Sequence, residues 1–363
     1  MIQLNPPSQN DFRAAIADWL EITTLLDSRG ISTGASILNV LDVLEDHAAE
    51  PEPIDPVTGE WLDEAILDDP RNQYVDIAFS ELAYRQETLG ESYPFSVEMN
   101  PYNRHRISRI EAAETPHPGR TVYLFCLLAS AIRDGKLVAG EPDAEFGSAK
   151  LRIPNIFQIC SCMAAGGYIR GEVSSFGFPR ANGTNFLAAL RETYYRFGVG
   201  TVRDSDEIPD GYPTSLKDGG IDVVAWLDHP DKMPGKIYLL GQCASGLNWR
   251  QKPVFEYVSQ LHGSWFSFAP AQFATPAMFI PFLLHHDLGE ERSGPFLAAV
   301  KNRFHYDERT FGIIFDRLRI AHFANDCLSL DESKRLKVDG ADRLIEVQNW
   351  VDDLLRMTLE EAA

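Results

Sequence analysis

The sequence predicts a mixed α/β protein, from its composition, the helical periodicity of its first part and a β-hairpin in its second. The chain has 363 residues, of which 44% are hydrophobic and 24% charged, as in ordinary globular proteins. At roughly 150 residues per domain, this length allows about two domains. We expect a mainly helical region over 1–150, with a docking or regulatory role, and a mixed domain over 151–363 that ends in helices.

Helical spacing of apolar residues dominates the first region. It predicts helices over residues 8–29, 32–47, 74–89 and 121–133. The acidic, proline-containing segment 49–69 predicts an extended loop. Around 93–97 and 106–110 the pattern shortens, which indicates a pair of strands.

The second region alternates between helical and β-type runs. Helices are expected over 155–165, 185–197, 253–261, 294–304, 308–324 and 341–359. Gly166-Gly167 would end the first of these helices and Gly198 the second. Short β-type runs predict strands over 199–203, 221–226, 236–240, 265–268 and 277–284.

The charge balance limits the partners that this surface can bind. Asp plus Glu number 53 and Lys plus Arg 33, so the formal net charge is −20. Such a surface repels nucleic acid and anionic lipid unless positive charge is concentrated in one place. This argues against a general nucleic-acid coat protein. It leaves room for a nuclease with a local basic groove, or for one that borrows DNA contacts from a partner.

The cysteines and the hydropathy favour a cytoplasmic protein. Five cysteines, an odd number lying mostly in apolar runs, suit reduced thiols better than a disulfide framework. The first residues carry no basic segment followed by an apolar one, so no secretory signal is expected. No uninterrupted apolar stretch reaches the ~18 residues of a membrane span, so we expect no membrane association.

The stretch from 217 to 243 stands apart as a candidate site. Two apolar runs flank a turn that contains Pro230, Pro234 and Gly235, a pattern typical of an antiparallel hairpin. Asp222 begins the first run and Gln242 ends the second. Their separation suits two residues that face each other across such a hairpin.

Asp222 and Gln242 would offer one carboxylate and one neutral oxygen, and the backbone carbonyl of Cys243 could add another. These are hard ligands suited to Mg²⁺ (or Mn²⁺), which binds to a few protein oxygens and keeps its waters. Such a metal can activate a water molecule and neutralise charge that builds on a phosphodiester. A nearby lysine would orient the water or hold the phosphate.

These residues resemble a known family. Asp-Gly-Gly-Ile-Asp at 218–222 and Gln-Cys at 242–243 look like the Mrr-type branch of the PD-(D/E)XK restriction-endonuclease-like superfamily, over roughly 183–262. The resemblance implies a restriction-endonuclease-like core, Mg²⁺-dependent DNA cleavage, and work in bacterial restriction or anti-phage defence. By the resemblance, Asp222 is the catalytic metal-binding aspartate and Gln242 occupies the acidic-or-glutamine position.

The chain departs from the family pattern at the motif lysine, because position 244 is Ala244. One interpretation is that Lys252, further along, reaches back toward the metal, with Arg250 as a weaker substitute. The other is that the site is inactive and Lys236, at the base of the strand, lies in the wrong place. The family also places a glutamate on the preceding helix, and Glu192 is the candidate in 185–197, unless it is simply a solvated helix charge.

Three hypotheses from different classes follow. The leading one is a metal-dependent endonuclease acting on DNA. Because the chain has no Walker ATP-binding motif, an ATPase or helicase partner is expected. The second is a catalytically inactive module of the same fold that binds nucleic acid or a partner protein. The third is a structural or regulatory subunit that forms a homo-oligomer, in which the apolar stripe of the helix at 341–359 serves as a contact.

Overall fold

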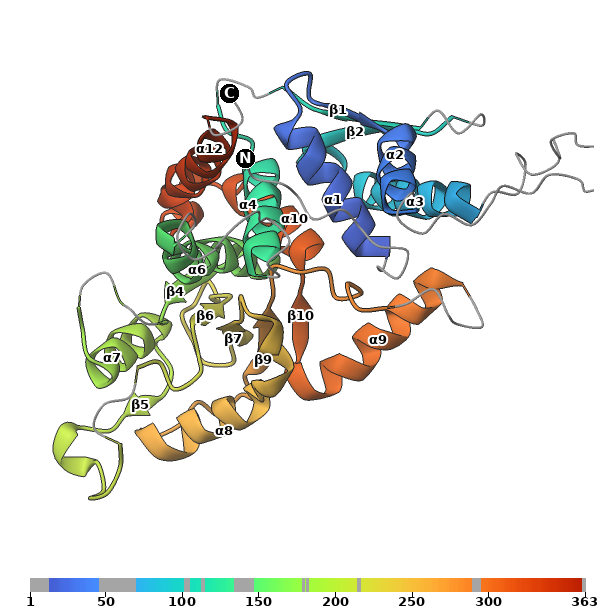
Figure 1. The fold of residues 1–363 in the computed structure, drawn as a ribbon. Coiled ribbons are helices and arrows are strands. Elements are labelled where there is room, and N and C mark those ends of the chain that lie inside the picture. The colour runs from blue at the N-terminus through green and yellow to red at the C-terminus, as the bar shows by residue number, and fades with distance from the viewer. Residues whose placement is uncertain are drawn as a thin grey trace, which may run out of the picture.

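The computed structural model describes residues 13–45, 70–100, 105–111, 115–133, 147–177, 180, 183–213, 217–288 and 295–360. It has the mixed helix and sheet content that the sequence predicts. A five-stranded mixed sheet lies between two sets of helices, and a three-stranded antiparallel sheet packs with the first helices of the chain (Figure 1). The segment 49–69, predicted as a loop, lies outside the described residues.

The small sheet belongs to the first region. Its strands follow the order β1-β3-β2. The elements of this region are α1 (Arg13–Leu26), β1 (Ile31–Thr33), α2 (Gly34–Glu45), α3 (Pro70–Leu89), η2 (Gly90–Ser92), β2 (Phe95–Glu98), β3 (Arg106–Arg109) and α4 (Pro118–Arg133). The predicted strand pair is confirmed, because Phe95 pairs antiparallel with Arg109.

The large sheet follows the order β10-β9-β7-β6-β4. Its strands are β4 (Glu172–Ser175), β6 (Val223–Trp226), β7 (Tyr238–Cys243), β9 (Thr275–Phe279) and β10 (Ile313–Phe315). The first three pair antiparallel, whereas β7, β9 and β10 run parallel. The predicted hairpin is therefore confirmed as β6 and β7.

Helices cover both faces of this sheet. The remaining helices are α6 (Gly147–Ile169), α7 (Phe186–Phe197), α8 (Val254–Trp265), α9 (Phe296–Phe311), α10 (Arg317–Leu328), α11 (Glu332–Arg335) and α12 (Leu344–Glu360). Apolar residues of α4, α6, α10 and α12 form one core with Val223 and Leu239, and those of α7 and α8 form another with Val224 and Leu240. The alternation along each strand therefore sends successive side chains to opposite helical layers.

Short elements complete the described chain. They are the ribbon of β5 (Thr201–Val202) and β8 (Phe266–Phe268), and the 3₁₀ turns η3 (Ser205–Glu207), η4 (Leu247–Gln251) and η5 (Ala341–Arg343). The segment after α11 lies beside β4, since Val173 and Val338 form a parallel bridge. This segment therefore covers the outer edge of β4.

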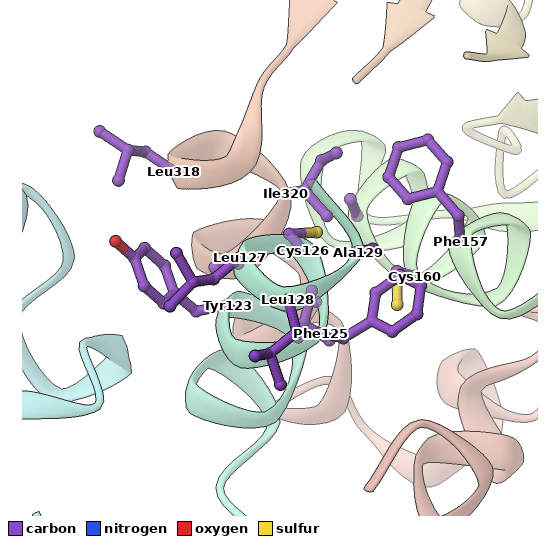
Figure 2. Close-up of a cluster of buried hydrophobic side chains, with 14 of the residues drawn as sticks. Tyr123, Phe125, Cys126, Leu127, Leu128, Ala129, Phe157, Cys160, Leu318 and Ile320 are labelled. Carbon is purple, nitrogen blue, oxygen red and sulfur yellow. The ribbon is translucent and has the colours of Figure 1, made fainter. Parts of the chain in front are cut away.

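One hydrophobic core runs through both regions. Phe125 and Cys126 of α4 pack with Phe157 and Cys160 of α6 and with Ile320 of α10, and all five are fully buried (Figure 2). A buried ionic network also crosses the fold. Asp18 of α1 accepts hydrogen bonds from Arg317 of α10 at 2.7 and 2.9 Å, and another from Arg85 of α3 at 2.7 Å.

The last helix belongs to the same core. The side chains of Val347, Trp350 and Leu354 are buried, and the indole of Trp350 packs edge-on against Phe125. Its Nε1–H donates to the carbonyl of Ala149 at 3.1 Å. The apolar stripe that the sequence offers as an oligomer contact is therefore occupied within the chain.

The structure corrects the predicted end of the helix at 155–165. Gly166 and Gly167 were expected to end it, but α6 continues to Ile169. A Cβ at Gly167 would lie only 1.9 Å from the carbonyl oxygen of Phe323 in α10. The glycine therefore serves close approach of two helices and does not break one.

A second correction concerns the helix predicted over 308–324. This stretch contains the end of α9, the strand β10 and most of α10. Gly312 separates the first two with a φ of +70°, and Asp316 caps α10 by accepting from the N–H of Arg319. The apolar run Ile313–Phe315 fits helical and strand periodicity equally, which explains the wrong prediction.

Candidate active site

Asp222 and Gln242 lie opposite each other at the open end of the β6–β7 hairpin. Val223 pairs with Gly241, so the antiparallel register places Asp222 opposite Gln242. The N–H of Asp222 donates to the carbonyl of Gly241 at 2.8 Å, and the N–H of Cys243 donates to Asp222 Oδ2 at 2.7 Å. These two bonds hold Asp222 against the end of β7.

The glycines before Asp222 make the turn into β6. Gly219 and Gly220 have φ values of +63° and +81°, a region that side chains with a Cβ rarely adopt. Asp218 Oδ1 accepts from the N–H of Gly220 at 2.9 Å. Asp218 therefore caps the turn, and its negative charge also acts on Asp222.

The environment of Asp222 opposes its ionisation. Burial, followed by the charge of Asp218, raises the pKa of Asp222 to about 7, against the opposing effects of the Cys243 N–H and the Lys252 ammonium. At neutral pH the protonated and the ionised form of the carboxyl are therefore both populated. A cation bound beside it would stabilise the charged form.

A small cradle of oxygens forms in front of Gly177, just after β4. A Cβ at Gly177 would lie 2.5 Å from Asp222 Oδ1, 2.6 Å from Gln158 Oε1 and 2.7 Å from Gln158 Nε2, so only glycine leaves this space open. Gln158 projects from α6, and its amide donates to Ser175 Oγ at 2.7 Å and to the carbonyl of Asp222 at 3.3 Å. The N–H of Gly177 donates to the same carbonyl at 3.0 Å.

Gln242 adds a carboxamide oxygen with unused bonding capacity. Its side chain is 8% exposed, and within the described residues its Oε1 has no hydrogen-bond partner. A buried oxygen without a donor is costly, and a cation would satisfy it. The oxygens of Asp222 and Gln158 meet in front of Gly177, and together with the oxygen of Gln242 they are of the hard kind that Mg²⁺ or Mn²⁺ prefers.

The candidate metal ligands carry little negative charge. The described parts of the chain contain no group of three or more His, Cys, Asp and Glu side chains placed to hold a metal. One carboxylate and two carboxamides would therefore carry the binding. Because affinity depends on the number of charged ligands, such a site would hold Mg²⁺ weakly.

The structure brings Lys252 near the site and keeps Arg250 away. The ammonium of Lys252, directly after η4, lowers the pKa of Asp222. Arg250 is tied by ion pairs to Asp287 at 3.0 Å and to Asp307 at 3.1 Å. Ala244, at the motif position, is fully buried in an apolar cluster.

Lys236 lies at the opposite end of the hairpin from Asp222. It forms an ion pair with Asp228 at 2.6 Å and donates to the carbonyl of Phe197. Its charge is therefore used within the base of the hairpin.

Cys243 contributes through its backbone. Burial raises the pKa of the Cys243 thiol well above its ordinary value, so the thiol stays neutral, and the N–H is bonded to Asp222. All five cysteines of the chain are free thiols.

Glu192 is exposed on α7, where it lines a cavity beside the site. The side chain that reaches Asp222 from a helix is Gln158 of α6. Sequence reasoning missed Gln158, because it looked for an acidic residue on the helix nearest the motif. An amide in the helix before β4 was the available signal.

The comparisons with known proteins give no relatives for this chain. Neither a protein-family model, a curated protein nor a solved structure matches it. The described helices include none that is long and apolar enough to cross a membrane.

Proposed function

We propose that the protein is a metal-dependent nuclease that hydrolyses phosphodiester bonds of DNA. The observation that carries this proposal is the cradle in front of Gly177, where Asp222 Oδ1 and the carboxamide of Gln158 converge on the position that a Cβ would fill. The unsatisfied oxygen of Gln242, opposite Asp222, supports it.

The order of the elements also supports the proposal. The resemblance to restriction-endonuclease-like proteins implies a helix, a strand, the Asp-Gly-Gly-Ile-Asp strand, the Gln-Cys strand and a helix. The chain presents α6, β4, β6, β7 and α8 in this order, with α7 and the short strand β5 between β4 and β6, and α6 and β4 precede the stretch 183–262 that carries the resemblance. In this assignment the first helix is α6. Gln158, and not Glu192, then occupies the position at which the family has a glutamate.

The residues take the following roles in the proposal. Asp222 and Gln242, with Gln158 and the carbonyl of Cys243, hold Mg²⁺ or Mn²⁺. The bound ion supplies an acidified water and neutralises charge on the phosphodiester. Asp222 must lose its proton to bind the ion. Lys252 orients the attacking water or holds the phosphate.

We infer a cytoplasmic role in restriction or anti-phage defence, with an ATPase or helicase as partner. The net charge of −20 supports a dependence on a partner, because the surface as a whole repels DNA. The first region, which shares the core with the sheet, offers the surface for docking.

A second candidate is an inactive nuclease fold that binds nucleic acid or a partner protein. Ala244 favours it, because a fully buried methyl group stands where the family motif has its lysine. The two candidates differ in whether Lys252 replaces that lysine.

Cleavage of plasmid and linear DNA with Mg²⁺ or Mn²⁺ tests the proposal. We expect Asp222→Ala to abolish cleavage and Lys252→Gln to slow it by about 10²–10³-fold. Lys232→Gln, which removes an exposed charge at the hairpin turn, serves as the matched control and should cleave normally. Cleavage that persists in Asp222→Ala would refute the assignment, and a normal rate in Lys252→Gln would remove that lysine from it.

A further inference from the structure

A cavity of about 800 Å³ opens beside the candidate active site. Its walls come from α6, the end of β4, α7 and the segment 335–343, which covers the outer edge of β4. Gln158, Ser175 and Gly177 line it, and Gln158 and Gly177 also bond to the carbonyl of Asp222. Gln158 and Gly177 are therefore shared between the cavity and the Asp222 site.

Four arginines line this cavity in a chain whose net charge is −20. Two of them have carboxylate partners. Arg196 forms an ion pair with Asp339 at 3.1 Å, and Arg343 one with Glu346 at 2.7 Å. These two arginines hold the wall together and are not available to a ligand.

The other two arginines, Arg180 and Arg335, form no ion pair within the described residues. Arg180 donates to the carbonyls of Thr184 and Lys217, and its Nε is buried without a partner. Arg335 is half-buried and donates one long bond, 3.5 Å, to the carbonyl of Leu328. A partly buried guanidinium without an anion lacks the partner that would compensate its lost hydration.

The other residues that line the cavity indicate which kind of anion it can bind. The described residues of the wall include no aromatic side chain, so bases have no stacking surface there. The acidic lining residues Glu192 and Asp342 are exposed to solvent. Guanidinium groups with hydroxyl and amide neighbours suit phosphate oxygens.

We propose that this cavity binds a backbone phosphate of the nucleic-acid strand, held by Arg180 and Arg335, next to the phosphodiester that is cut at Asp222. The inference rests on the proposed nuclease function. It gives the segment 335–343, which lies more than 100 positions beyond Asp222, a direct role in strand binding.

Fluorescence anisotropy with a labelled DNA oligonucleotide, the full chain and EDTA tests the inference without cleavage. Arg335→Gln should weaken binding about tenfold and reduce the slope of log K against log salt by about 1. Lys334→Gln removes an exposed charge one position away, outside the cavity, and should change affinity by less than about twofold.

Equal effects of the two substitutions, or an oligonucleotide that does not bind the wild type, would overturn the inference. A mononucleotide that binds as tightly as the oligonucleotide, with the same dependence on Arg335, would assign the cavity to a small phosphate compound instead. EDTA removes the metal, so this assay measures binding independently of cleavage. If binding depends on Arg335 but the protein does not cleave DNA when Mg²⁺ or Mn²⁺ is supplied, the nuclease proposal is refuted and the phosphate site is retained.

Discussion

The carboxylate of Asp222 accepts a hydrogen bond at 2.7 Å from the backbone N–H of Cys243. This bond fixes Oδ2 at the end of β7, while Oδ1 is directed toward the space in front of Gly177. The hairpin thereby determines where a metal ion could meet the carboxylate. The same arrangement leaves a partly buried acid whose charge is costly without a cation.

Replacing that acid should therefore stabilise the metal-free protein. The pKa of Asp222 is about 7 in the folded chain against an ordinary value of 3.8. The folded state thus holds its proton longer than the unfolded state, and Asp222 costs stability increasingly as the pH rises from about 4 to 7. Asp222→Asn keeps an oxygen for the Cys243 N–H and removes this cost.

Thermal or urea unfolding in EDTA measures the effect. At pH 8 we expect Asp222→Asn to raise the free energy of unfolding by about 1–2 kcal/mol, less than the full shift allows because the side chain is partly exposed. At pH 4 the two proteins should be equally stable. A variant that is less stable at pH 8, or equally stabilised at both pH values, would contradict this electrostatic account.

A methyl group at Gly177 should close the cradle. In Gly177→Ala the new Cβ would lie 2.5 Å from Asp222 Oδ1, which forces the carboxylate out of position. Because misplacement by about 1 Å costs about 10²-fold in rate, cleavage should fall by that order. Gly263→Ala in α8, where a Cβ meets no atom within 4 Å, is the control and should cleave like the wild type. Equal rates for all three proteins would show that the cradle is not used.

Adding charge at Gln242 should strengthen metal binding. Gln242→Glu places a second carboxylate opposite Asp222, and calorimetry should show Mg²⁺ binding about tenfold tighter. Gln272→Glu is a suitable control, because Gln272 also has a buried oxygen without a described partner but lies at the other end of β7, beside Tyr238. The account fails here if Gln242→Glu leaves the affinity unchanged or if Gln272→Glu raises it equally.

The ionic network of the core should make the two regions unfold together. Burial alone would raise the pKa of Asp18, but Arg317 and Arg85 outweigh it and hold that pKa well below its ordinary range. Asp18 therefore contributes stability at neutral pH that is lost only under strongly acid conditions. Asp18→Asn leaves the buried guanidinium of Arg317 without its carboxylate, while Arg85 keeps Glu21 and Glu81, and should cost about 3–5 kcal/mol.

Calorimetry with two optical probes checks this prediction. Because the chain has six tryptophans, variants that keep only Trp19, in α1, or only Trp226, in β6, report on the first region and on the large sheet. Both should show one coincident transition, shifted down in Asp18→Asn. Two separate transitions in the wild type would show that the regions are independent folding units.

The sequence predicted the local features of the site and missed its long-range partners. The hairpin was predictable, because two apolar runs flank a turn rich in proline and glycine. Gln158 was not, because it meets Asp222 only after α6 packs on the sheet, and no nearby residue marks it. The strand β10 was missed for a similar reason: three apolar residues fit either period, and pairing with β9 decides between them.

We propose above all that Asp222 and its neighbouring oxygens hold a divalent metal. Electron paramagnetic resonance of Mn²⁺, which reads the free ion, tests it most directly with the wild type and Asp222→Asn. We expect the wild type to bind one Mn²⁺, with affinity that falls about tenfold per pH unit below pH 7, and Asp222→Asn to lose this binding. Binding that is equal in the two proteins, or independent of pH between 5 and 8, would contradict the account.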